Sequence, residues 1–187
     1  ANDWEVAEFH FRRALESDPD YAAAHAQLGR VLMQRRRDQG KSEAATLNEA
    51  EGHLRLALAS DGDYYWTRFY LGNLCWQKEK LDEAEAHLKR ATELLPECYE
   101  PHLYYGELLC FGLKRLRVGE QHLRRALALN AESGVTRFTY GKFLHGQHCH
   151  EEAQAQFQLA YRLGDERAAP YLEDYEYAAG YGDLDEH

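Results

Sequence analysis

The fold is decided by residues 65–96, which read YWTRFYLGNLCWQKEKLDEAEAHLKRATELLP. This stretch predicts two helices joined by a short turn at residues 79–81. In the first helix, Leu71, Leu74 and Cys75 recur at helical spacing and therefore mark a buried face. The second helix carries a buried set of its own, which consists of Leu81, Ala84, Leu88, Ala91 and Leu95. Packed through these faces, the two helices would form one helical hairpin.

The same features return in register along the chain. Small residues lie at Ala14, Ala57, Ala91, Ala126 and Ala160, which are separated by 43, 34, 35 and 34 residues. Large apolar residues precede them by three positions, at Phe11, Leu54, Leu88, Leu123 and Phe157. Further small residues precede them by seven positions, at Ala7, Ala50, Ala84, Gly119 and Ala153. A glycine marks the first helices, at Gly29, Gly72, Gly106 and Gly141. A helical repeat of about this length predicts a solenoid of stacked hairpins.

This pattern resembles the tetratricopeptide repeat over roughly residues 4–165. The resemblance implies an all-α fold, a right-handed α-solenoid of helical hairpins closed by a C-terminal capping helix. The expected parts are a half repeat with only the second helix at 4–19, a repeat with a nine-residue insertion at 21–62, repeats at 64–96, 98–131 and 133–165, a capping helix at 167–179 and an acidic tail at 180–187. Where the family often has Trp early in the first helix, this chain has polar residues, namely His25, Arg68, His102 and Arg137. They are expected either to be less buried or to extend their polar ends to the surface.

The first predicted helix, residues 4–17, matches a second helix that has no first helix beside it. We therefore expect it to have an uncovered apolar edge, and we expect the chain to be a fragment of a larger protein. The alternative is that Trp4, Phe9 and Phe11 form an atypical cap at the end of the array.

Two irregularities interrupt the repeat. The nine extra residues of the 21–62 repeat predict that both of its helices run about a turn longer, with Ser42 as an N-cap. The basic residues 35–37 are expected in a solvated turn, or alternatively in a docking patch for an acidic partner. In the 98–131 repeat, the turn at 112–117 is expected to hold one extra residue, and Gly119 to weaken its helix by about 1 kcal/mol.

Composition excludes several classes of function. The net charge is −10, and most of it comes from the C-terminal tail, so nucleic acid is an unexpected partner. Apolar runs all fall short of the roughly 20 residues that a membrane span needs. The four cysteines have no short paired spacing, which indicates reduced thiols and a cytoplasmic location.

No motif for catalysis or phosphate binding is present, so we expect neither an enzyme nor a cofactor. Clustered donors at His145, His148, Cys149 and His150 raise the alternative of zinc. Because a second pair at metal-ligand spacing is lacking, no metal site is predicted.

The first helices of such an array line its concave side, which is where we expect a protein or peptide partner. The residues projected onto that face are Arg30, Trp66, Phe69, Asn73, Trp76, Leu103, Glu107, Phe138 and Lys142. The alternative for the aromatic residues is ordinary packing between repeats. A family subclass binds carboxylates through clustered Lys, Arg and Asn, but the matching positions here include Ala26, Tyr70, Glu100 and Tyr104, which disfavours that mode.

Three functions remain open on the sequence. The first is a non-catalytic interaction scaffold that binds a partner in the concave groove. The second is a structural spacer, with self-association through the ends of the array, and the third is a regulatory domain of a larger protein. The acidic, Tyr-rich residues 171–181 are a candidate self-ligand.

Overall fold

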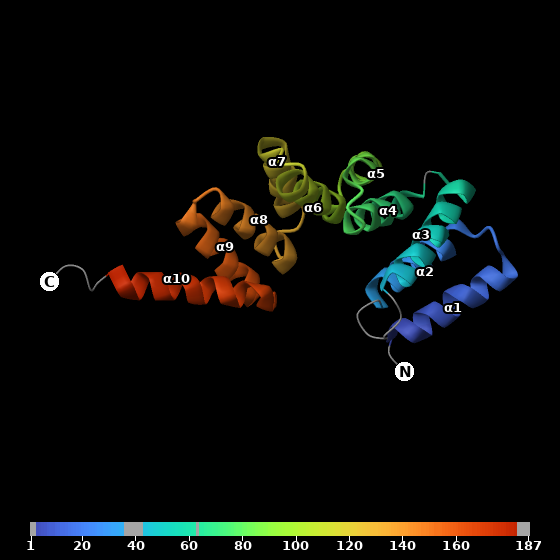
Figure 1. The fold of residues 1–187 in the computed structure, drawn as a ribbon, viewed down its shortest axis with the longest axis horizontal. Coiled ribbons are helices and arrows are strands. Elements are labelled where there is room, and N and C mark those ends of the chain that lie inside the picture. Colours follow the sequence, from blue (N-terminus) through green and yellow to red (C-terminus); the bar gives the residue numbers. More distant parts are fainter. Residues whose placement is uncertain (1–2, 36–42, 63, 183–187) are drawn as a thin grey trace. The chain divides into compact units, whose positions relative to one another are not determined.

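The computed structural model describes residues 3–35, 43–62 and 64–182, and in this part of the chain all regular structure is helical. The all-α class predicted from the sequence is therefore confirmed. The chain divides into two compact units, Ala1–Leu95 (unit 1) and Pro96–His187 (unit 2). Figure 1 shows the helices in chain order from blue to red.

Unit 1 consists of two hairpins preceded by a single helix. Its helices are α1 (Asp3–Ser17), α2 (Ala22–Arg35), α3 (Glu43–Ser60), α4 (Tyr65–Gln77) and α5 (Leu81–Leu94). The closest pairs are α2 with α3 and α4 with α5, as the repeat pattern predicts. In addition, α1 packs on α2, and α4 packs on both α2 and α3.

Unit 2 consists of two further hairpins followed by a closing helix. Its elements are α6 (Tyr99–Glu107), a π-helical turn (Leu108–Gly112), α7 (Leu116–Leu129), α8 (Gly134–Gly146), α9 (His150–Arg162), a short 3-10 turn (Glu166–Ala168) and α10 (Ala169–Gly182). The pairs α6 with α7 and α8 with α9 form the hairpins, and α10 packs on α9.

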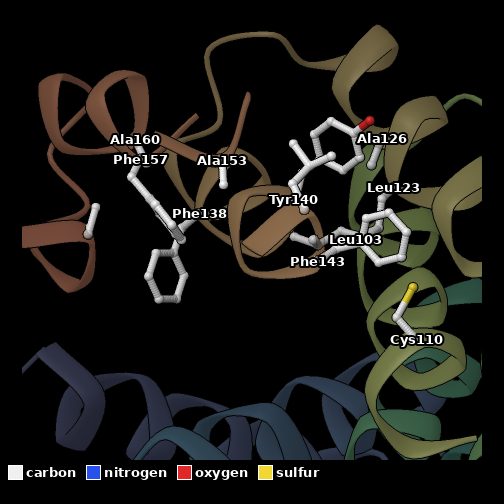
Figure 2. Close-up of a cluster of buried hydrophobic side chains, with 12 residues drawn as sticks. Leu103, Cys110, Leu123, Ala126, Phe138, Tyr140, Phe143, Ala153, Phe157 and Ala160 are labelled. Carbon is white, nitrogen blue, oxygen red and sulfur yellow. The ribbon is translucent and has the colours of Figure 1, made fainter. Parts of the chain in front are cut away.

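Each hairpin is held by a glycine of its first helix seated on a large apolar residue of its second helix. A Cβ added to Gly72 would lie 2.6 Å from Cγ of Leu88, and one added to Gly141 would lie 2.8 Å from Cε1 of Phe157. The large residues of all four hairpins are fully buried, namely Leu54, Leu88, Leu123 and Phe157. Figure 2 shows the resulting core of unit 2, which includes Leu123, Phe138 and Phe157.

The extra residue of the 98–131 repeat lies at the end of the first helix and not in the turn that follows. The carbonyl of Leu108 accepts from the amide of Leu113 at 2.9 Å, and the carbonyl of Leu109 accepts from Arg115 at 2.7 Å. In the α4–α5 hairpin the equivalent bond runs from the amide of Lys80 to the carbonyl of Cys75. The bond from Arg115 to Leu109 reaches one residue further along the chain. A π-helical turn thus absorbs the additional residue, as such turns do within α-helices.

Gly119 also has a packing role that its low helix propensity did not indicate. A Cβ at Gly119 would lie 2.3 Å from Sγ of Cys110 and 3.0 Å from the carbonyl oxygen of Gly106. The π-helical turn contains Cys110, so the two helix backbones meet here more closely than an alanine allows. The packing of Gly119 therefore opposes the cost of its low helix propensity.

The insertion lengthens α3, which has 18 residues where α5 has 14. Helix α2 has 14 residues and is described as far as Arg35. Residues 36–42 lie outside the described part of the chain, and with them Ser42 and the rest of the basic run. The expectations for residues 35–37 remain predictions.

Helix α1 has the uncovered apolar edge that the sequence predicts. Its three register positions, Ala7, Phe11 and Ala14, are only half-buried, whereas the equivalent positions of the four hairpins are buried. At the other end of the chain, α10 covers the core of unit 2. The Tyr171 ring stacks on Phe157 at 4.4 Å between centroids.

The closing helix runs to Gly182, although a helix was expected only over 167–179, with the tail beginning at residue 180. A single glycine lowers helix stability by about 1 kcal/mol and does not by itself end a helix. The first residues of the expected cap form the 3-10 turn, which Asp165 caps by accepting from the Arg167 amide.

Two alanine substitutions should have opposite effects on stability. Gly72→Ala forces a Cβ into Leu88 and should lower the free energy of unfolding by about 1–3 kcal/mol. Gly52→Ala is the matched control, because its Cβ would meet nothing within 4 Å. It should raise stability by roughly 0.5–1 kcal/mol. Urea unfolding followed by circular dichroism measures both, and equal effects would contradict the packing role of Gly72.

Candidate partner-binding site

Helix α4 presents the predicted aromatic face of unit 1. Steps of three, four and three residues place Trp66, Phe69, Asn73 and Trp76 on one side of the helix. Asn73 and Trp76 are half-buried and Trp66 is exposed in part as well, which leaves a portion of each side chain open to a ligand. Phe69 is only 6% exposed and forms the floor beneath them.

Tyr70 is a further member of this face, one that the sequence projection had not included. The ring of Trp66 stacks on Tyr70 at 5.8 Å with an interplanar angle of 15°, and it meets Phe69 edge-on at 5.6 Å. The signal for Tyr70 was present in its spacing of four residues from Trp66. These contacts pack the Trp66 ring against two aromatic residues of its own helix.

Arg30 of α2 supplies positive charge in the same unit. Its guanidinium lies 5.7 Å from the ring centroid of Trp4, which is a cation–π arrangement. Its Nε donates to Oε1 of Gln27 at 2.9 Å, so the side chain is fixed at two points. The structure therefore brings Trp4 of α1 next to a predicted site residue.

The predicted residues of unit 2 divide into a buried floor and a charged rim. Leu103 of α6 and Phe138 of α8 are buried, being 2% and 8% exposed. Nζ of Lys142 lies 4.8 Å from the Phe111 ring centroid and 5.8 Å from that of Phe138. Phe111 follows Glu107 by four residues, so helical spacing was again the signal that could have identified it.

Arg167 completes the rim of unit 2, and the sequence analysis missed it. Its guanidinium lies 4.6 Å from the Phe138 ring centroid. The same group donates to both carboxylate oxygens of Asp165, at 2.8 and 2.5 Å. These hydrogen bonds hold the pKa of Asp165 below its usual value and that of Arg167 above it.

Glu107 is a half-buried carboxyl group close to this rim. Burial raises the pKa of Glu107, and the positive charges of Lys142 and Arg167 offset that effect only in part. Burial is also the main reason why the pKa of the Tyr104 phenol is raised, with Glu107 adding to it. The rim therefore combines two cations with a carboxyl group that resists ionisation.

Two histidines of the cluster at the end of α8, His145 and His150, contact the closing helix. The hydroxyl of Tyr175 lies 2.8 Å from Nδ1 of His145 and 3.5 Å from Nδ1 of His150, which ties α10 to the last hairpin. Within the described residues there is no group of three or more His, Cys, Asp or Glu side chains arranged to hold a metal ion.

The described thiols differ in exposure but are all unpaired. Burial raises the pKa of Cys75 and of Cys98 to about 11, and that of Cys110 to about 12. Such thiols stay protonated at neutral pH and are poor nucleophiles. Cys149 is exposed.

Stacked hairpins with a glycine seated on a large apolar residue define an α-helical repeat protein. A family model described as tetratricopeptide repeat matches residues 69–98, which confirms the resemblance: the chain contains a tetratricopeptide repeat and has the fold of that family. The match spans most of the α4–α5 hairpin, the stretch from which the repeat was first deduced.

Solved structures carry the same fold across most of the chain. A thermophilic TPR protein of Thermus thermophilus superposes with a TM-score of 0.73 at 21% identity, covering 90% of both chains. PilF of Pseudomonas aeruginosa gives 0.72 at 24% identity, covering 97% of this chain and 82% of its own. YrrB, described as a TPR protein with an unusual peptide-binding site, gives 0.64 at 22% identity, covering 94% and 85%.

No curated protein is significantly similar in sequence to this chain. Among the described helices, none is both long and apolar enough to cross a membrane.

Glu107→Gln should stabilise the protein at neutral pH. Because the folded-state pKa of Glu107 is raised, its ionisation costs stability as the pH rises through that value. The variant should therefore melt above the parent at pH 7.5, and the difference should shrink toward pH 4. Differential scanning calorimetry at the two pH values tests this, with Glu132→Gln on the exposed surface as control. A variant that melts below the parent at pH 7.5 would contradict the prediction.

Proposed function

We propose that this protein is a non-catalytic scaffold that binds a segment of a partner protein on the faces of its first helices. The observation that carries the proposal is the incompletely buried pair Trp66 and Trp76, set on one face of α4 with Asn73 between them. A core packing role alone would favour burying both indole rings, as it does for Phe69.

Two physical reasons make this face suitable for binding. Aromatic anchors dominate the energetics of many interfaces, and one such residue is often worth about 2 kcal/mol or more. The stacking of Trp66 on Tyr70 reduces the rotamer freedom that binding would otherwise remove. Asn73 carries both a donor and an acceptor, which suits it to a partner's backbone.

The charges favour a partner segment with acidic residues. Arg30 in unit 1 lies over the Trp4 ring of α1, and Lys142 in unit 2 lies over the Phe111 ring of the π-helical turn. A carboxylate clamp of the kind known in the family is not proposed, because Ala26 is fully buried and Glu100 would repel a carboxylate. The peptide-binding site named for YrrB supports a peptide ligand by analogy of fold alone.

A structural role within a larger assembly is the second candidate. It is favoured by the half-buried Ala7, Phe11 and Ala14 of α1, because end-to-end stacking of repeats would cover such an edge. In either role we infer a cytoplasmic protein, on the ground of its unpaired thiols, and a protein or peptide as partner in preference to nucleic acid.

A peptide-display selection against the intact chain tests the proposal. We expect the selected peptides to be enriched in acidic residues. Their affinity should fall at least tenfold for Trp66→Ala and for Trp76→Ala, and less for Arg30→Ala, as measured by isothermal titration calorimetry.

Tyr161→Ala is the matched control, since Tyr161 is an aromatic residue of α9 that is 52% exposed and lies outside the proposed face. Circular dichroism must show that every variant is folded. Unchanged affinity in both Trp variants would exclude the α4 face and transfer the proposal to the ends of the array.

A further inference from the structure

The polar residue four positions before each hairpin glycine forms a recurring contact. In the α2–α3 hairpin, Nε2 of His25 lies 2.9 Å from the carbonyl oxygen of Pro19, and Nδ1 of His25 lies 2.9 Å from Nδ1 of His53. His25 thus links the loop before its own helix to the second helix of the hairpin. His25 is buried, contrary to the expectation that it would be less buried than the Trp of the family.

Unit 2 repeats the arrangement in the α6–α7 hairpin. Nε2 of His102 lies 3.2 Å from the carbonyl oxygen of Pro96, and its Nδ1 lies 3.0 Å from Nδ1 of His122. His102 is buried as well, so the expectation of lower burial is wrong here too. The same geometry occurs in two separate units, although 28 residues separate the partners in one pair and 20 in the other.

The other two hairpins use arginine at this position. Nη1 of Arg68 lies 3.4 Å from Nδ1 of His87. Arg137 donates from Nε to the carbonyl of Ala131 at 2.9 Å and from Nη1 to Oε1 of Gln156 at 3.0 Å. The Arg137–Gln156 contact makes the same two connections without any group that titrates near neutral pH, and it is therefore an internal control.

The hydrogen bonds fix the protons of each histidine pair. A carbonyl can only accept, so the Nε2 of His25 and of His102 must carry a proton. In the neutral pair, the Nδ1 of that residue is then an acceptor, and its partner donates from Nδ1. The centroids are 5.1 and 5.2 Å apart, as expected when the two nitrogens point straight at each other. A metal ion between them would require a wider separation.

Acid disturbs this arrangement in two steps. A first added proton binds the outer nitrogen of His53 or His122 and creates a cation in a half-buried position. A second proton must go to Nδ1 of the first-helix residue, where two N–H groups then face each other at hydrogen-bonding distance. That step removes the bond and brings two cations together.

We propose that the pairs His25–His53 and His102–His122 are acid-sensitive contacts, which weaken the α2–α3 and α6–α7 hairpins as the pH falls below about 6.5, whereas the Arg137–Gln156 contact of the α8–α9 hairpin does not respond.

The surroundings of the unit 1 pair disfavour added charge. The pKa of His53 is lowered by burial, then by His25 and by Arg12 of α1, while Glu49 of α3 opposes the shift. Glu16 of α1 is a second acidic group in the lining of a cavity of about 490 Å³. This cavity also borders both histidines, so solvent protons can reach them.

The surroundings of the unit 2 pair also disfavour added positive charge. Burial and then His102 lower the pKa of His122 to about 4. Burial also lowers the pKa of His102, where the Pro96 carbonyl and Glu97 oppose the shift and Arg125 adds to it. The ring of Tyr105 meets His122 edge-on at 4.7 Å and closes that side.

The sign of the effect on stability follows from these shifts. An unfolded histidine takes up its proton near pH 6.5, whereas the lowered pKa values of His53, His102 and His122 delay their protonation to lower pH. Between those values the unfolded chain holds more protons, so stability falls as the pH falls. Each such histidine lowers the folding equilibrium constant by up to about tenfold per pH unit. His87 acts in the same direction, because burial and then Arg68 lower its pKa.

The two units differ in how the loop before the first helix of the pair is supported. In unit 2, Nη2 of Arg125 lies 3.4 Å from the Pro96 carbonyl, which therefore keeps a partner when His102 moves. The equivalent position in unit 1 is Leu56, which has no hydrogen-bond donor in its side chain. The loop before α2 therefore lacks this second support for its contact with His25.

A transplant of the Arg–Gln contact tests the proposal in the full chain. The variant H25R/H53Q/H102R/H122Q copies Arg137–Gln156 into both hairpins. The urea concentration at the unfolding midpoint of the parent should be lower at pH 5 than at pH 7. For the variant, the difference between the two pH values should be much smaller. His10→Gln is the control, because His10 is an exposed histidine outside the pairs and should leave the difference unchanged. A variant that loses stability as steeply as the parent would overturn the proposal.

Long-range ¹H–¹⁵N spectra of the parent keep the idea testable even if the variant fails to fold. We expect His25 and His102 to carry the proton on Nε2, and His53 and His122 to carry it on Nδ1. The titration midpoints of His53 and His122 should lie below about 6.5, the ordinary pKa of histidine. Midpoints at or above that value, or the opposite tautomers, would overturn the proposal.

Discussion

The contact between a glycine of one helix and a large apolar residue of the next is the constraint on which the rest of the structure depends. At Gly72 a side chain as small as methyl would meet Cγ of Leu88 at 2.6 Å, so the two helix axes are as close as side chains permit. Close approach fixes the rotation of each first helix about its own axis. That rotation decides which residues face the second helix and which, like Trp66 and Asn73, face away.

The candidate binding positions are therefore set by packing. Once Gly72 and Leu88 meet, the residues three before and one after the glycine must lie on another side of α4. The same geometry in unit 2 places Phe138 and Lys142 beside each other, and there the larger side chain is buried while the charged one stays at the rim. A repeat can thus change its surface chemistry without altering its fold.

Sequence periodicity was sufficient for the hairpins because burial depends on the spacing within a single helix. It was insufficient for the π-helical turn. An extra residue in the helix and an extra residue in the following turn give the same number of residues between Gly106 and Gly119, so the sequence does not distinguish them. The histidine pairs were missed because each joins two helices. Arg167 was missed because it reaches the rim from a 3-10 turn beyond the last hairpin.

The closing helix has a consequence for how such an array can grow. Tyr175 occupies the place in α10 that Gly141 holds in α8, 34 residues earlier. The phenol group is directed at His145 and His150 of the preceding hairpin, so the position cannot receive a large side chain from a following second helix. A further hairpin packed against α10 in the way that the others pack would therefore require a smaller residue in place of Tyr175.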